Sequence, residues 1–110
     1  MSKGKRIQFR NKYNSYDCEL VKQSYSNGRT ALELVAWEDD HDRDLFEGEP
    51  IATCTVNILE IELEENEVLI KDYSENEGML QSLLDAGIVK TTGKVMSSGF
   101  VTIPVCVLID

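Results

Sequence analysis

Two stretches of alternating hydrophobic and polar residues flank an Asn-Gly pair early in the chain. Residues 18–26 and 29–37 follow the period of two that is typical of β-strands. The Asn-Gly pair at positions 27 and 28 tolerates the positive φ angles of a two-residue type I′ turn. The pattern therefore predicts a β-hairpin in which Tyr25 faces Thr30 and both faces carry hydrophobic side chains.

Shorter strand patterns cover much of the remaining chain. They occupy residues 7–9, 51–58, 61–63, 68–71, 94–96 and 100–109, and a turn is expected at residues 91–93. Pro104 has no backbone N–H to give to a β-ladder. The last strand is therefore expected to lie at a sheet edge or to be bulged at Pro104.

One amphipathic helix is predicted between residues 75 and 86. Ser74 and Glu77 have the spacing of a capping box, in which each side chain accepts a hydrogen bond from the backbone N–H of the other residue. Gly87 fits the left-handed position that ends a helix in a Schellman motif. Gly78 would weaken a helix by about 1 kcal/mol relative to alanine, so we expect it to pack closely against a strand or to contact a ligand or partner.

These elements together predict an α+β fold, a mainly antiparallel β-meander of about five to six strands with one capped helix packed against it. With 110 residues, the chain has the size of one domain with a core of its own. We therefore expect a single domain over residues 1–110, in which residues 1–12 form a basic, flexible arm that includes a short strand.

The charge of the chain changes along its length. The formal net charge is −9, but the first twelve residues contain no acid and five bases, which are Lys3, Lys5, Arg6, Arg10 and Lys12. The remainder carries all 20 acidic residues and only six basic ones. Such an acidic body repels nucleic acid and anionic membranes and attracts basic surfaces, although negative charge also serves solubility alone.

The acidic residues gather in two stretches, residues 38–49 and 60–67. The first stretch contains Arg43 as its single Lys or Arg residue and is followed by Pro50. A solvated surface loop and a partner-binding loop both fit this composition. The candidate partner-binding residues are Glu38, Asp39, Asp40, Asp42, Asp44 and Glu47, together with Tyr73 and Asn76 near the start of the predicted helix.

The sequence offers no recognisable catalytic constellation or metal site. Leu45 and Ile51 stand where an EF-hand loop would need a glycine and a bidentate glutamate. His41, the one histidine, has no cysteine near it in sequence to share a zinc ion and no nucleophile beside it. We therefore expect no enzyme activity, no metal and no cofactor.

The cysteines and the lengths of the hydrophobic runs indicate the compartment. Cys18, Cys54 and Cys106 are odd in number, lack CxxC spacing and fall in predicted strands, which favours reduced, buried thiols. No hydrophobic run approaches the roughly 18 residues of a membrane helix, and none follows the basic N-terminus as a secretory signal requires. We expect a cytoplasmic protein that does not bind membranes.

Several short motifs resemble a known group of proteins. They are Thr55-Val56-Asn57, the string YSENEGM at residues 73–79, Ala86-Gly87-Ile88, and Ser98-Gly99-Phe100-Val101 followed by Pro104 and Cys106. Over roughly residues 18–109 the chain resembles a small family of unknown function that is encoded mainly by phages and mobile elements of bacteria. The resemblance implies this biological setting and no catalytic residue. The acidic stretch at residues 39–44 departs from the family pattern.

Two hypotheses for the function follow. The first is a non-enzymatic phage or mobile-element protein that binds a host or defence protein with a basic surface, and its two acidic stretches could mimic DNA if they share a face. The alternative is a nucleic-acid accessory protein that binds through Lys3, Lys5, Arg6, Arg10 and Lys12. Because the acidic body disfavours direct nucleic-acid binding, we expect the first function.

Overall fold

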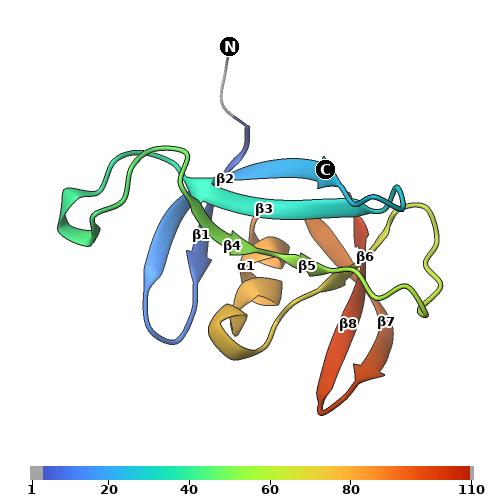
Figure 1. Ribbon diagram of the computed structural model, residues 1–110. Helices are drawn as coiled ribbons and strands as arrows, with labels where there is room; N and C mark the ends of the chain where they lie inside the picture. The colour runs from blue at the N-terminus through green and yellow to red at the C-terminus, as the bar shows by residue number, and fades with distance from the viewer. Residues whose placement is uncertain (1–3, 110) are drawn as a thin grey trace.

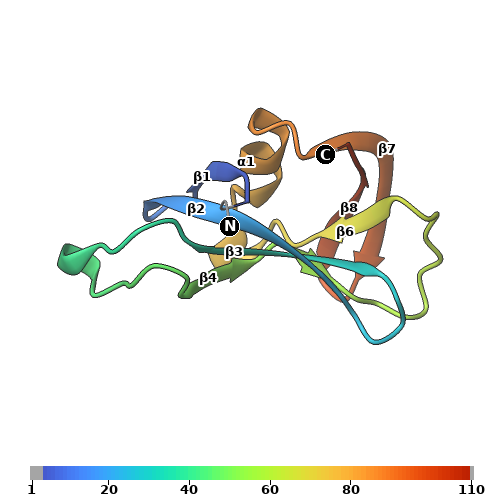
Figure 2. The ribbon, with the colours of Figure 1, turned by 90° about the horizontal axis from the view of Figure 1, so that it is seen from above.

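The computed structural model describes residues 4–109, and in this part of the chain it contains eight β-strands, two short 3₁₀-helices and one α-helix. The strands form two four-stranded antiparallel sheets, and the helix packs beside them (Figures 1 and 2). The predicted α+β class is confirmed, with eight strands in place of about five or six.

The first sheet is a meander of four strands in chain order. They are β1 (Arg6–Arg10), β2 (Ser15–Ser24), β3 (Thr30–Ala36) and β4 (Pro50–Thr53). Alternate residues of these strands point to the interior, so that Cys18, Leu20, Leu32 and Leu34 are buried. The alternating hydrophobic residues of the predicted hairpin therefore include one set that faces the core.

The N-terminal segment belongs to the body of the protein. β1 pairs with β2 from Arg6 opposite Glu19 to Arg10 opposite Ser15. Two side chains of β1, those of Ile7 and Phe9, point inward and are 3% and 2% exposed. The short strand predicted at residues 7–9 is confirmed as part of β1. Residues 6–10 are not flexible, because these hydrophobic side chains anchor the strand. Residues 1–3 of the predicted arm lie outside the described part of the chain.

The second sheet has the strand order β5 (Thr55–Val56), β6 (Glu67–Ile70), β8 (Val101–Leu108) and β7 (Val89–Ser98). β8 lies between β6 and β7, so Pro104 is not on an edge strand. The last strand is not bulged at Pro104 either, because Pro104 pairs with Val95. The irregularity lies next to it in β7, where three residues between Thr91 and Val95 oppose one residue of β8. The turn predicted at residues 91–93 is wrong, because β7 continues through these residues. Gly93 lies within the irregularity at a φ of 84°.

Cys54 marks the point where the chain passes from the first sheet to the second. The strand predicted at residues 51–58 is divided here into β4 and β5. The backbone N–H of Cys54 donates to the carbonyl of Leu32 in β3, while its own carbonyl accepts a hydrogen bond from Lys71, directly after β6. A single residue thus connects the hydrogen-bond ladders of both sheets.

The loop of residues 57–66 covers the outer face of the second sheet. Its hydrophobic side chains pack on a small second core of Leu69, Ile103 and Val105. The strand predicted at residues 61–63 is wrong, because the chain there is loop. Arg29, which follows the β2–β3 turn, holds this loop in place by donating hydrogen bonds to the carbonyls of Ile58 (2.8 Å) and Ile61.

The β2–β3 hairpin is present, but its register differs from the prediction by one residue. Ser24, not Tyr25, pairs with Thr30. The N–H of Gly28 donates to the carbonyl of Tyr25, and the N–H of Tyr25 donates to the carbonyl of Arg29. This is a three-residue loop with its glycine in the left-handed bulge position, at a φ of 87°. The extra loop residue accounts for the shift in register.

The helix begins later than predicted. A 3₁₀-turn, η2 (Ser74–Asn76), precedes the helix α1 (Met79–Asp85), and neither N-cap residue makes a side-chain capping bond. The predicted capping box is therefore wrong. Asp72 takes its place, because its Oδ1 accepts hydrogen bonds from the backbone N–H groups of Gly78 (3.1 Å) and Leu80 (2.9 Å).

Replacing Asp72 with alanine should lower the free energy of unfolding by about 0.5–2 kcal/mol, because the start of α1 loses its acceptor. Asp72→Asn is the matched control, since an amide oxygen can still accept these hydrogen bonds. Urea denaturation of both variants measures the difference. Equal midpoints for the two variants would show that Asp72 does not cap the helix.

The end of the helix agrees with the prediction. The N–H of Ile88 donates to the carbonyl of Leu83, and the N–H of Gly87 donates to that of Leu84. Gly87 adopts a φ of 72°. These are the two hydrogen bonds and the left-handed residue of a Schellman motif, so the C-terminal boundary is confirmed.

Gly78 packs directly against β1. Its φ is 108°, and a Cβ atom added to it would lie 2.1 Å from the carbonyl oxygen of Arg10. Close packing on a strand, one of the two alternatives for this glycine, is therefore confirmed. Ser82 strengthens the contact, because its Oγ accepts a hydrogen bond from the N–H of Arg10 at 3.1 Å. The helix thus covers the edge of β1 (Figure 1).

The main core lies between the two sheets and the helix. It unites residues of all three layers, among them Ile7, Cys18, Leu34, Ile70, Met79, Leu83 and Cys106. These side chains are at most 3% exposed. The core therefore depends on both ends of the chain, from β1 to β8.

Candidate partner-binding site

The first acidic stretch, residues 38–49, lies wholly in an ordered hairpin between β3 and β4, here named the acidic hairpin (residues 37–49). It projects from one end of the first sheet (Figure 1). Asp40 and Leu45 exchange backbone hydrogen bonds of 2.9 and 3.0 Å. Between them lies the 3₁₀-turn η1 (His41–Arg43), after which Asp44 adopts a left-handed φ of 56°. The acidic stretch is therefore a structured element.

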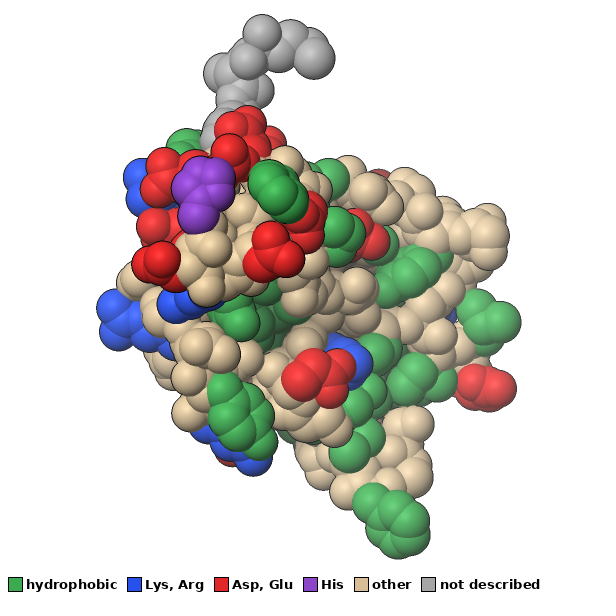
Figure 3. Space-filling view, turned by 60° about the vertical axis from the view of Figure 1, so that its left-hand side comes forward, with side chains coloured by type: hydrophobic (Ala, Val, Ile, Leu, Met, Phe, Trp, Pro, Cys, Tyr) green, Lys and Arg blue, Asp and Glu red, His purple; other side chains and the backbone are tan. Residues whose placement is uncertain are grey.

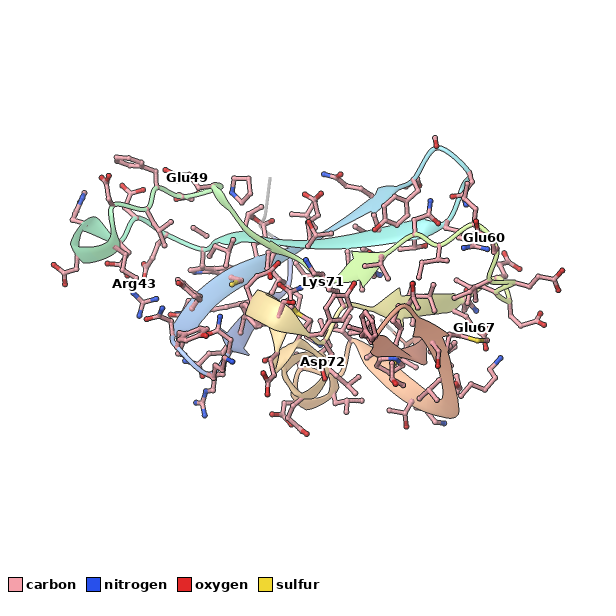
Figure 4. All side chains as sticks on the ribbon, turned by 60° about the horizontal axis from the view of Figure 1, so that its bottom comes forward. Arg43, Glu49, Glu60, Glu67, Lys71 and Asp72 are labelled. Atoms are coloured by element: carbon pink, nitrogen blue, oxygen red, sulfur yellow. The ribbon has the colours of Figure 1, made fainter. Side chains whose placement is uncertain are left out.

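Arg43 fastens the acidic hairpin to β2. Its guanidinium donates a hydrogen bond of 2.7 Å to the carbonyl of Ser15 and lies 4.6 Å from the centre of the Tyr16 ring. The same group lies 3.5 Å from the carboxylate of Asp40. Figure 4 shows Arg43 on the side of the hairpin that faces β2. These contacts hold the hairpin in one position relative to the sheet.

The carboxylates of the acidic hairpin have two roles. Asp39 and Glu49 stabilise the loop, since they accept hydrogen bonds from the backbone N–H groups of Glu47 (2.8 Å) and Phe46 (3.1 Å). The candidates Glu38, Asp42 and Asp44 have exposed side chains. Two carboxylates thus stabilise the hairpin from within, while those of Glu38, Asp42 and Asp44 are exposed to solvent.

A cavity of about 430 Å³ lies between the acidic hairpin and β2. Five carboxylates line it, those of Asp17, Glu38, Asp39, Asp40 and Asp42. Arg43, which carries a positive charge, and His41 also line this cavity. Carboxylates around one hollow raise the local concentration of cations. The acid-lined cavity can therefore accept a positively charged group such as a lysine or arginine side chain.

A hydrophobic cavity of about 250 Å³ adjoins the acid-lined cavity. Its lining is mainly hydrophobic and consists of Phe9, Tyr16, Leu45, Pro50, Ile51 and Ala52, together with the polar residues Asn11, Glu75 and Asn76. Tyr16, Leu45 and Ile51 line both cavities, so the two are neighbours. Figure 3 shows hydrophobic side chains in a hollow below the acidic side chains and the histidine. One face of the protein thus places a hydrophobic cavity beside a cation-accepting one.

The two acidic stretches lie at opposite ends of the molecule. The acidic hairpin and the loop of residues 57–66 extend in opposite directions in Figures 1 and 2. Glu49 and Glu60 are correspondingly far apart in Figure 4. The two acidic stretches are therefore separated along the molecule and do not form one continuous patch. Only the acidic hairpin contributes carboxylates to the acid-lined cavity, together with Asp17 of β2.

Tyr73 and Asn76, the two candidate residues outside the acidic hairpin, both make contacts within the fold. Asn76 is 2% exposed, and its Nδ2 donates a hydrogen bond of 2.6 Å to the carbonyl of Thr53. Tyr73 packs against the second core, with Lys71 Nζ 5.7 Å from the centre of its ring. Asn76 also lines the cavity of about 250 Å³ beside the acidic hairpin, whereas Tyr73 lines neither of the two cavities. The assignment of both residues as partner contacts stays a prediction.

The basic residues of the alternative hypothesis are interleaved with acidic ones. Lys3 lies outside the described residues, and Lys5 is exposed near the start of β1. Arg6 forms a 2.8 Å ion pair with Asp17 and lies over the Trp37 ring. Arg10 donates a hydrogen bond to the side chain of Gln8. The Nζ atom of Lys12 lies 3.7 Å from a carboxylate oxygen of Glu77. Acidic partners therefore offset part of the positive charge of this strand.

The three cysteines are buried and unpaired, as the sequence predicted. Burial raises the pKa of the Cys18 and Cys54 thiols to about 12 and that of Cys106 to about 11. A reactive thiol needs a lowered pKa, so these side chains serve packing. Within residues 4–109, no group of three or more potential ligands is placed to hold a metal ion, and no helix has the length and hydrophobicity to cross a membrane.

The sequence analysis did not identify the hydrophobic residues of the candidate site. Phe9, Tyr16 and Ile51 come from β1, β2 and β4 and meet only when the first sheet forms. The available signal was Arg43, which is the single Lys or Arg residue of the acidic stretch and makes the contacts to β2. Its neighbour on β2 could not be identified without the fold.

No protein-family model matches the chain, and comparisons with curated proteins and with solved structures give no match either. The resemblance to a phage-encoded family therefore stays an expectation from the sequence. The functional argument depends on the geometry of the acidic hairpin and the two cavities beside it.

Proposed function

We propose that this protein is a non-enzymatic binding protein that recognises a basic surface of a partner protein through its acidic hairpin. The acid-lined cavity is the observation that supports this function, because it places five carboxylates around one hollow. Arg43 holds the hairpin in position before any partner arrives. A preordered loop loses little conformational entropy on binding, and complementary charge speeds the encounter.

The biological setting of this proposal comes from the sequence. The resemblance to proteins of phages and mobile elements makes a host or defence protein in the bacterial cytoplasm the expected partner. A partner with an exposed cluster of lysine and arginine side chains would be attracted by the net charge of −9.

The test compares two variants that remove the same charge from opposite ends of the molecule. The first is Glu38→Gln, Asp42→Asn and Asp44→Asn, all exposed. It spares Asp39 and Asp40, because their carboxylates hold the Glu47 N–H and the Arg43 guanidinium. The matched control is Glu60→Gln, Glu62→Gln and Glu65→Gln in the loop of residues 57–66. Each tagged protein is used to capture partners from bacterial lysate after nuclease treatment, over a series of salt concentrations.

We expect the wild type and the control to retain a common protein partner that moderate salt releases, since salt screens exposed charges. The hairpin variant should bind that partner about 10- to 100-fold more weakly, if each lost charge contributes roughly 0.5–1 kcal/mol. Equal capture by both variants would refute recognition through the acidic hairpin. If the captured proteins are lost after nuclease treatment, the result would favour nucleic-acid binding by the basic residues of the N-terminal segment.

A further inference from the structure

The hydrophobic cavity beside the acidic hairpin has the size of one large side chain. Its volume of about 250 Å³ lies below the roughly 300–1,000 Å³ of typical small-molecule pockets. Phe9 lines it from the core and is 2% exposed, whereas Leu45 and Ile51 are only partly buried. A hydrophobic side chain that enters this cavity would leave water and contact several apolar groups at once.

The acid-lined cavity already shows which charge its surface accepts. The protein's own Arg43 lies there against the Tyr16 ring, with its guanidinium 3.5 Å from the Asp40 carboxylate. Glu38 and Asp42 line the same cavity with exposed carboxylates. A second guanidinium or ammonium group would therefore meet an excess of negative charge.

We propose that the two neighbouring cavities bind an extended segment of the partner, with a hydrophobic residue in one cavity and a lysine or arginine two positions away in the other. This inference rests on the proposed function and names its ligand. In an extended chain, residues two positions apart point the same way and lie roughly 6–7 Å apart. That spacing suits two cavities that share Tyr16, Leu45 and Ile51 in their walls.

Charge and hydrophobicity together select this ligand. The carboxylates of the acid-lined cavity repel acidic segments and the phosphates of nucleic acid. A polyamine or a purely basic chain would satisfy the carboxylates but would leave the hydrophobic cavity exposed to water. A segment that carries both kinds of side chain fills both cavities, and we expect it to bind best.

The first experiment selects a displayed library of random nine-residue peptides on the immobilised full-length protein. Peptides with a recurrent hydrophobic residue two positions from a lysine or arginine are expected. One selected peptide is then labelled and its affinity measured by fluorescence anisotropy. Replacement of its hydrophobic residue by serine, or of its basic residue by glutamine, should each weaken binding at least tenfold.

Two protein variants locate the binding surface. Leu45→Ser removes a side chain that lines both cavities and should weaken the peptide at least tenfold. Leu59→Ser is the matched control, because Leu59 is 68% exposed in the loop at the other end of the molecule and should leave the affinity unchanged. Chemical-shift mapping on the wild-type protein gives a second reading, in which the amide signals of Tyr16 and Ile51 should shift.

Several results would overturn the inference. These are a selection without a recurrent sequence, an affinity that depends on the basic residue alone, equal effects of Leu45→Ser and Leu59→Ser, and shifts that avoid the two cavities. If capture from lysate still depends on the acidic hairpin in that case, the proposed function stands and only the peptide ligand is wrong. If capture ignores the hairpin as well, both are wrong.

Discussion

Gly78→Ala is expected to lower the free energy of unfolding by roughly 2–5 kcal/mol. A side chain in a left-handed backbone conformation costs about 1–2 kcal/mol, and overpacking of a tightly packed contact costs about 1–3 kcal/mol. Gly78 combines both costs, because its φ is 108° and its added Cβ would lie 2.1 Å from the carbonyl oxygen of Arg10. The backbones of α1 and β1 would have to separate. Urea denaturation monitored by circular dichroism measures the loss.

Gly28→Ala separates the two costs. Gly28 also has a positive φ, 87°, but no described atom lies within 4 Å of its added Cβ. We therefore expect only the backbone cost of about 1–2 kcal/mol. Equal losses for Gly28→Ala and Gly78→Ala would mean that the contact between α1 and β1 is looser than the structure shows.

Phe9→Ala should cost about 3–5 kcal/mol, the usual range for a buried aromatic side chain. Phe9 is 2% exposed in the main core, and its ring centre lies 6.4 Å from that of Tyr16. Alanine would leave a void that the packed strands around it cannot fill. Against a total stability of about 5–15 kcal/mol for a typical domain, such a loss should be visible as a large shift of the urea midpoint.

Gln8→Ala is the matched control on the same strand, because Gln8 points to solvent. A surface substitution of this kind is expected to change stability by about 0.5 kcal/mol or less. If Phe9→Ala were equally mild, the N-terminal segment would behave as the loose arm that the sequence suggested. If only Phe9→Ala is damaging, β1 is an essential strand.

Because β1 is part of the first sheet, nucleic-acid binding has to be tested by substitution of its basic residues and not by deletion of the segment. Deletion of residues 1–12 would remove Ile7 and Phe9 from the core, so any loss of binding could reflect unfolding. Substitution of the exposed Lys5, Arg10 and Lys12 by glutamine removes their charge and keeps the strand. Those variants test the basic residues alone.

The parts of the fold with strong local signals could be predicted from the sequence. Gly87 ends the helix where the chain needs a left-handed residue, and its two hydrogen bonds depend only on neighbouring residues. The alternation of residues 29–37 identified β3, since every second side chain there faces the core. The α+β class followed from several such signals.

The errors arose where distant contacts outweighed local preference. Ser74 and Glu77 form a plausible cap, but Gly78 must approach the carbonyl of Arg10, and this contact together with Asp72 determines where α1 begins. A short strand at residues 7–9 was predicted, but the charge of the first twelve residues concealed that Ile7 and Phe9 anchor this strand in the core. The same reason applies to the candidate site. Its acidic residues are close together in sequence and could be named from it, whereas the hydrophobic side chains beside them come from three strands.

The composition of the main core has a consequence for folding during synthesis. Ile7 and Cys106 belong to the same core, and the hydrogen bond between Arg10 and Ser82 spans 72 residues. Contacts this distant in sequence form late, because a long loop must close before they stabilise the chain. A nascent chain that ends before β8 therefore exposes the hydrophobic face of the first sheet, and stable folding has to wait until β8 has left the ribosome.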